Sequence, residues 1–101
     1  MMSIPLINIR SPFKEDLEAA ISILRKYEVS EIFLFGSLAD GTYHENSDID
    51  IAVKGLKPEL FLKAYADLSF HINRNVDLLN MDTQERFTEM LHSIKELIRV
   101  A

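Results

Sequence analysis

The run from Asp48 to Val53 (DIDIAV) limits what this chain can fold into more than any other segment. Its alternation of apolar with acidic or small residues is the pattern of a β-strand with one buried face. The other face then carries Asp48, Asp50 and Ala52. Asp is disfavoured in strands, so two aspartates in one short strand need a reason other than packing. The segment therefore predicts a sheet with an acidic surface on it.

Three glycines and three prolines divide the rest of the chain into short periodic segments. Apolar residues spaced by three and four predict helices from about Pro12 to Tyr27, from Pro58 to Leu68 and from Asp82 to Ile98. Short apolar runs predict two further strands, Val29 to Phe35 and Asn75 to Asn80. Helices and strands thus alternate through most of the chain.

This order predicts an α/β (α+β) fold, with a small mixed sheet of three to four strands and helices on one face. The first two strands can pair antiparallel through a loop, whereas the second and third are joined by a helix and can be parallel. The last helix is predicted to begin at Asp82, because Glu85 follows three positions later as in a capping box. Apolar residues near the N-terminus suit an added edge strand, a partner contact or, as the favoured interpretation, packing against the domain; they are Ile4, Leu6, Ile7 and Ile9.

The composition restricts the class of protein. With 101 residues, 48% of them hydrophobic, the chain has material for one modest core, and we expect residues 1–101 to form a single domain. The absence of Cys excludes disulfides and Cys-based zinc sites. Eleven Lys and Arg against 16 Asp and Glu disfavour a nucleic-acid partner. No apolar run approaches the ~20 residues of a membrane span, and no signal peptide is evident, so we expect a cytoplasmic protein without a membrane partner.

Three aspartates on two neighbouring strands form the first candidate site. Asp48 and Asp50 share a strand face, and Asp77 of the third strand can project onto the same face. Such a cluster is costly when fully ionised unless cations neutralise it. Oxygen ligands of high charge density favour Mg²⁺ first and Mn²⁺ second. Any one of these aspartates alone is as well explained by a loop cap or a solvated sheet face.

The pair Gly36-Ser37 forms the second candidate site, because it follows a predicted strand directly. A tight turn there exposes backbone N–H groups suited to an anion. Gly allows a phosphate to approach closely, and the Ser37 hydroxyl can donate a hydrogen bond to it. Gly-Ser after a strand is also a common turn, so its position relative to the aspartates is what makes it informative.

Together, FGSLADGTYHENSDIDIAV (Phe35 to Val53) and NVDLL (Asn75 to Leu79) resemble the DNA polymerase beta-like nucleotidyltransferase superfamily, and the short chain is similar to its minimal branch. The resemblance implies the nucleotidyltransferase fold and metal-dependent transfer of a nucleoside monophosphate, with ATP as the leading donor. It implies that Gly36 and Ser37 hold the triphosphate. It also implies that Asp48, Asp50 and Asp77 form the catalytic metal site for two Mg²⁺ ions, with Mn²⁺ as an alternative, and that Asp77 completes the site or assists deprotonation of the attacking hydroxyl.

One position departs from the pattern of the minimal branch. Where that branch often has Arg, within Gly-Ser-x-Ala-Arg-Gly, this chain has Asp40. A carboxylate near a triphosphate repels it, so nucleotide affinity could be weaker or activity lost.

The resemblance also implies a partner. Minimal nucleotidyltransferases commonly form the antitoxin half of a pair with a helical HEPN-type toxin. This chain would then modify a hydroxyl of that toxin, with Tyr as a candidate acceptor, or neutralise it by occlusion as a non-catalytic binding module. Small-molecule transfer, as in aminoglycoside-modifying enzymes, is disfavoured because no second domain is evident, although a homodimer could supply the missing surface.

The remaining polar and aromatic residues receive no functional assignment. His44, Lys54 and Arg74 are interpreted as solvated side chains. Phe87 and Met90 are interpreted as core residues rather than as a surface for a nucleobase.

Overall fold

The structure is a computed structural model that describes residues 9–93 and 97–101. Its elements, in chain order, are α1 (Phe13–Arg25), β1 (Glu31–Phe35), α2 (Ser37–Asp40), β2 (Ile49–Lys54), the 3-10 helix η2 (Pro58–Leu60), α3 (Phe61–His71), β3 (Val76–Asn80), α4 (Glu85–Ser93) and β4 (Ile98–Arg99). The mixed α/β class predicted from the sequence is confirmed. Within the described residues, no helix has the length and apolar character needed to cross a membrane.

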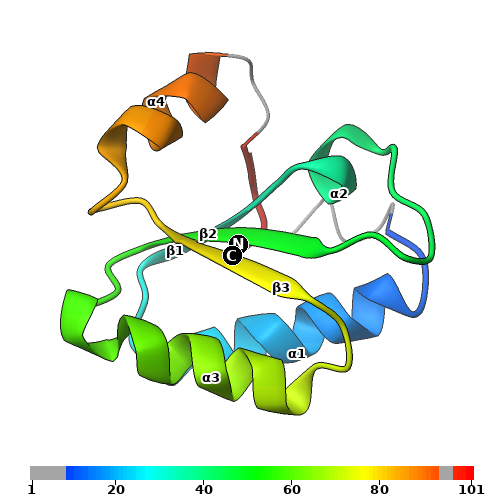
Figure 1. Cartoon of the computed structure of the whole chain (residues 1–101), viewed down its shortest axis with the longest axis horizontal. Coiled ribbons are helices and arrows are strands. Elements are labelled where there is room, and N and C mark those ends of the chain that lie inside the picture. Colours follow the sequence, from blue (N-terminus) through cyan, green and yellow to red (C-terminus); the bar gives the residue numbers. More distant parts are fainter. Residues whose placement is uncertain (1–8, 94–96) are drawn as a thin grey trace.

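The four strands form one sheet in the order β3-β2-β1-β4 (Figure 1). β1 pairs antiparallel with β2 and with β4, and β2 pairs parallel with β3. The parallel pair requires a crossover connection, which η2 and α3 supply. In this register Asp50 lies directly between Asp77 on one side and Phe35 on the other.

The main core lies between one face of the sheet and the helices α1 and α3 (Figure 1). The apolar residues of β2 that alternate with its aspartate are fully buried there: Ile49, Ile51 and Val53. From the helices, Leu17, Leu24 and Leu68 are likewise fully buried. Full burial of each such side chain stabilises the fold by roughly 1.5–3 kcal/mol, so these residues fix the orientation of β2 and hence of its polar face.

The opposite face of the sheet has its own small apolar cluster, formed by Phe33, Ala52 and Met81. The helix α4 stands over this side of the sheet (Figure 1), and Phe87 contacts Phe35 edge-to-face with ring centroids 6.0 Å apart. The expectation of helices on one face therefore describes α1 and α3, whereas α4 lies on the other. The apolar cluster on the second face must be covered by a further element, and here that element is α4. The sequence periodicity alone did not show on which face α4 lies.

The C-terminal segment differs from the predicted long helix. Among the described residues α4 spans Glu85–Ser93, and Ile98 belongs to β4, where it pairs with Leu34. Beyond β4, Val100 N donates to Ile32 O at 2.8 Å. These bonds satisfy polar groups on the outer edge of β1 that a helical tail would leave unpaired.

Asp82 is not the cap of α4. Its Oδ2 accepts a hydrogen bond from Gly55 N at 2.9 Å, and the helix begins at Glu85. A tertiary hydrogen bond to the turn after β2 thus replaces the local capping box that the sequence predicted. Near the other terminus, Ile9 is buried in the main core, whereas the predictions for Ile4, Leu6 and Ile7 lie outside the described residues.

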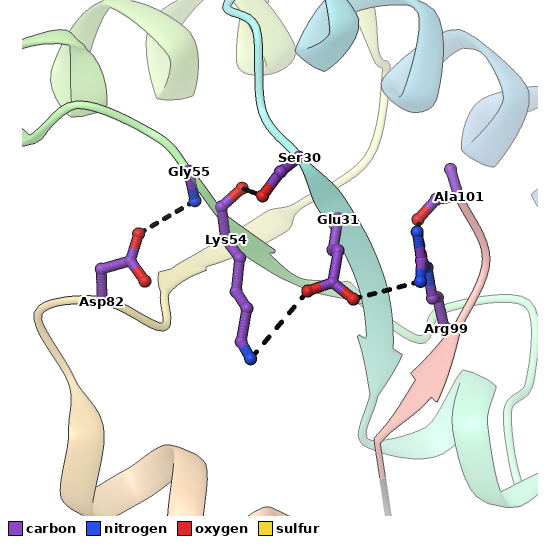
Figure 2. A network of polar contacts seen from close by, with 7 residues as sticks. All are labelled: Ser30, Glu31, Lys54, Gly55, Asp82, Arg99 and Ala101. Atoms are coloured by element: carbon purple, nitrogen blue, oxygen red, sulfur yellow. Dashed lines mark hydrogen bonds and ion pairs between the residues drawn. The ribbon is translucent and has the colours of Figure 1, made fainter.

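A network of paired charges holds one end of the sheet together (Figure 2). Glu31 lies between two cations: its Oε1 is 3.9 Å from Lys54 Nζ, and its Oε2 is 3.2 Å from Arg99 Nη1. Arg99 Nε also donates to Ala101 O at 3.0 Å. Lys54, interpreted from sequence as solvated, is partly exposed but paired. This network joins β1, β2 and β4 at the end of the sheet that carries Lys54 and Arg99.

Candidate active site

Asp50 and Asp77 form a pair of carboxylates on neighbouring parallel strands. They are direct partners in the β2–β3 register, on the face that α1 and α3 do not cover. Burial, a hydrogen bond with Asp77 and the negative charges of Asp77 and Asp48 together raise the pKa of Asp50 from 3.8 to about 6. The sequence placed these two acids on one face, and the structure brings them into contact.

Asp48 contributes to the same site through its charge. It lies just before β2, is exposed, and acts on Asp50 by electrostatic repulsion. We refer to Asp48, Asp50 and Asp77 as the acid cluster. In the described part of the chain, however, no three His, Asp or Glu side chains are gathered tightly enough to hold a metal ion as they stand. The acid cluster is therefore a contacting pair with a third carboxylate nearby.

Gly36 packs directly against the acid cluster. A Cβ atom on Gly36 would overlap Oδ2 of Asp50 and would lie 3.1 Å from its Cγ. The backbone of Gly36 also has φ +71°, a conformation that side-chain-bearing residues rarely adopt. Only glycine therefore allows the turn after β1 to approach the Asp50 carboxylate this closely. The two candidate sites found in the sequence are one site in the structure.

Ser37 is the first residue of the short helix α2 and is half-buried beside this turn. At the end of α2, Oδ1 of Asp40 accepts hydrogen bonds from Thr42 N at 2.9 Å and from Thr42 Oγ1 at 2.6 Å. These two bonds lower the pKa of Asp40, which stays ionised. Asp40 is thus an exposed, turn-forming carboxylate four residues after Gly36.

Arg74 was wrongly interpreted as a solvated residue. Its side chain is only 15% exposed, and it forms an ion pair with Asp16 of α1. It also donates a hydrogen bond to Glu45 O in the loop that leads to Asp48. No sequence pattern marks this residue, because its partners lie 58 and 29 positions away. His44, by contrast, takes part in a local turn, where it accepts a hydrogen bond from Asn46 N at 3.2 Å.

An aromatic surface adjoins the acid cluster. Phe35 is the direct β1 partner of Asp50, and the ring of Phe87 on α4 contacts the ring of Phe35 edge-to-face. Phe87 is 39% exposed and Met90 is 47% exposed, so their interpretation as core residues was wrong. The site is therefore acidic at its centre and apolar on the α4 side.

Comparison with known proteins decides the family. Residues 18–99 match the family model described as Polymerase beta, Nucleotidyltransferase. The chain belongs to this nucleotidyltransferase family. A search of curated proteins gives no match.

The solved structures that are similar to this nucleotidyltransferase domain include three toxin-antitoxin proteins. One, described as a toxin-antitoxin with AMP-PNP, is 27% identical with a TM-score of 0.68, and the match covers 83% of this chain and 71% of that chain. The second is a toxin-antitoxin MntA-HpeT carrying two Asp-to-Glu substitutions; it is 25% identical with a TM-score of 0.66 over 83% of this chain and 71% of that chain. The third is a Tyr-to-Ala variant of MntA-HpeT, 26% identical with a TM-score of 0.66 over 84% of this chain and 71% of that chain.

Proposed function

We propose that residues 1–101 act as one minimal, metal-dependent nucleotidyltransferase domain that transfers a nucleoside monophosphate to a hydroxyl of a partner protein. The leading donor is ATP, which would supply AMP. The observation that carries this proposal is the contact of the Asp50–Asp77 carboxylate pair with the Gly36 turn. This contact brings oxygen ligands for a cation next to backbone N–H groups suited to phosphate.

The chemistry of the acid cluster fits a hard divalent cation. Burial and the neighbouring carboxylates together raise the pKa of Asp50, and a bound cation would relieve the part that comes from repulsion between carboxylates. Asp50 and Asp77 would hold Mg²⁺ or Mn²⁺ between them, and the exposed Asp48 side chain would complete the set by rotation. When bound, two such ions lower the pKa of an attacking hydroxyl and stabilise the departing pyrophosphate.

The other residues of the site act on the nucleotide and the acceptor. The backbone at Gly36 and the hydroxyl of Ser37 would bind the β- and γ-phosphates. Asp77 would accept the proton of the acceptor hydroxyl or orient that hydroxyl. Asp40, ionised and exposed, adds a negative charge near the same turn, so we expect weak nucleotide affinity compared with a chain that has Arg there.

The similar structures support a role as the antitoxin of a toxin-antitoxin pair. All three are described as toxin-antitoxin proteins, and one contains an ATP analogue. In another, the two substituted aspartates are two positions apart, which is the spacing of Asp48 and Asp50. We therefore propose a helical HEPN-type toxin as the cytoplasmic partner, with a homodimer as a further possible assembly.

The test is Mg²⁺-dependent labelling of a purified HEPN-type partner from ATP labelled at the α-phosphate. Asp48→Ala and Asp50→Ala each remove a metal ligand worth several kcal/mol of transition-state stabilisation, so labelling should fall by about 100-fold or more. Glu31→Gln, at the other end of the sheet, is the matched control and should label normally. Equal labelling by the wild type and both Asp variants would reject the proposal.

A second candidate is a non-catalytic antitoxin that neutralises its partner by occlusion. It is favoured by the observation that no three acidic or His side chains in the described residues are gathered to hold a metal. In this case folded Asp50→Asn protein would neutralise the toxin as well as the wild type does. A folded Asp50→Asn variant that binds the toxin but fails to neutralise it would instead favour catalysis.

A further inference from the structure

Arg74 connects the helix layer to the loop that precedes the acid cluster. It lies between α3 and β3, three residues before Asp77. Its Nε is 3.1 Å from Oδ2 of Asp16 on α1, and the guanidinium carbon lies 3.9 Å above the centroid of the Phe13 ring. The ion pair and the ring contact together fix the guanidinium plane, because each limits a different rotation of the side chain.

The free side of the same guanidinium reaches the loop before β2. Nη1 donates to Glu45 O at 2.7 Å and makes a longer contact of 3.5 Å with Ser47 O. The shorter bond is a charge-assisted hydrogen bond to a backbone carbonyl, which is stronger than a neutral one. Two of the three residues before Asp48 are therefore held by Arg74.

The main chain reinforces this connection. Ile49 N donates to Asn75 O at 2.9 Å, so the residue after Asp48 is bonded to the residue after Arg74. Within the loop, Ser47 N donates to His44 O at 2.9 Å and His44 N donates to Ser47 Oγ at 2.9 Å. Asp48 thus lies between two backbone positions that are both tied to the segment leading into β3.

We propose that Arg74 is a positioning residue for the acid cluster: it fixes the backbone ahead of Asp48 and so sets the distance between Asp48 and the Asp50–Asp77 pair. The inference rests on the proposed function. It explains why an Arg is needed, since a planar group with five donors can bond Asp16 and the loop carbonyl at once. A Lys ammonium carries the same charge but cannot reproduce this fork.

The experiment compares Arg74→Ala and Arg74→Lys with Arg99→Ala as the matched control. Arg99 also forms one ion pair and one hydrogen bond to a backbone carbonyl, but at the far end of the sheet. Two quantities are measured on the full chain: amide hydrogen exchange of residues 42–48, and Mg²⁺ affinity by calorimetry with AMP-PNP present. Circular dichroism establishes that each variant is folded.

We expect Arg74→Ala to increase exchange in residues 42–48 and to weaken Mg²⁺ binding by about 10-fold, the usual cost of losing a group that orients a metal ligand. Arg74→Lys should be impaired in the same direction, whereas Arg99→Ala should stay within about twofold of the wild type in both measurements. Should Arg74→Ala fail to fold, Arg74→Lys provides the same comparison.

Three results would overturn the inference, and they differ in what else they reject. Wild-type Mg²⁺ affinity in folded Arg74→Ala, or complete rescue by Arg74→Lys, would reject a positioning role and leave the proposed function intact. Failure of the wild-type chain itself to bind Mg²⁺ would reject the proposed function, and this inference with it.

Discussion

On the face of the sheet that α1 and α3 do not cover, the two ends differ in how their charged side chains are paired. At one end Glu31 lies between Lys54 and Arg99, so that each charge has a partner of opposite sign (Figure 2). At the other end Asp50 and Asp77 are in contact and Asp48 adds a third negative charge. Both ends belong to the same four-stranded sheet.

Under the proposed function, this difference separates an end that contributes to stability from an end that binds a cation. Alternating charges at the Glu31 end make a modest favourable contribution without any ligand. Neighbouring like charges at the Asp50 end lower the stability of the fold when no cation is bound. Such a cost is typical of functional sites. Removing one acidic charge from each end in turn should therefore change stability in opposite directions.

The largest effect should come from Gly36→Ala. The added methyl group overlaps the Asp50 carboxylate in a backbone conformation unfavourable for Ala, so we expect a loss of about 3 kcal/mol in unfolding free energy. Gly41→Ala is the control, since Gly41 has φ +85° but no atom within 4 Å of the added Cβ, and should lose only about 1–2 kcal/mol. Urea unfolding measures both. Equal losses would mean that Gly36 does not press against Asp50.

Asp50→Asn should stabilise the chain in the absence of metal. The native pKa of Asp50, about 6, lies above its ordinary value of 3.8, so between these pH values the native state holds a proton that the unfolded state releases. The contribution of Asp50 to stability is therefore full below pH 4 and is lost as pH rises through 6. The stability advantage of Asp50→Asn over the wild type should rise from near zero at pH 4 to about 1 kcal/mol at pH 8, a value reduced by solvent screening.

Urea unfolding of both proteins across this pH range provides the measurement, and the difference cancels titrations that the two proteins share. An advantage that is constant with pH, or a destabilised variant at pH 8, would mean that burial and the neighbouring carboxylates do not raise the pKa of Asp50 in the folded chain.

The smallest effect should come from the paired end. Glu31→Gln leaves Lys54 and Arg99 without their common partner, and exposed pairs of this kind contribute about 0.2–1 kcal/mol each. We expect a loss of no more than about 1 kcal/mol at pH 8, reduced at high salt. A gain in stability here would remove the contrast between the two ends.

The sequence predicted the strands and their acidic face because the alternation of Asp with Ile in β2 leaves only one arrangement that buries the isoleucines. It also identified Gly36, since a glycine directly after a buried strand suggests that another group approaches the backbone closely at that position. It did not predict β4 or the role of Asp82, because both depend on partners far along the chain: Ile98 pairs with Leu34, and Asp82 bonds Gly55. Arg74 was missed for the same reason.

The most direct test is calorimetric titration of AMP-PNP into the wild type and into Asp50→Asn, each with and without Mg²⁺. The wild type should bind the nucleotide analogue with Mg²⁺ and at least about 10-fold more weakly without it, whereas Asp50→Asn should show the weak affinity in both conditions. Affinity that is equal in the two proteins and indifferent to Mg²⁺ would contradict an acid cluster that binds metal and nucleotide together.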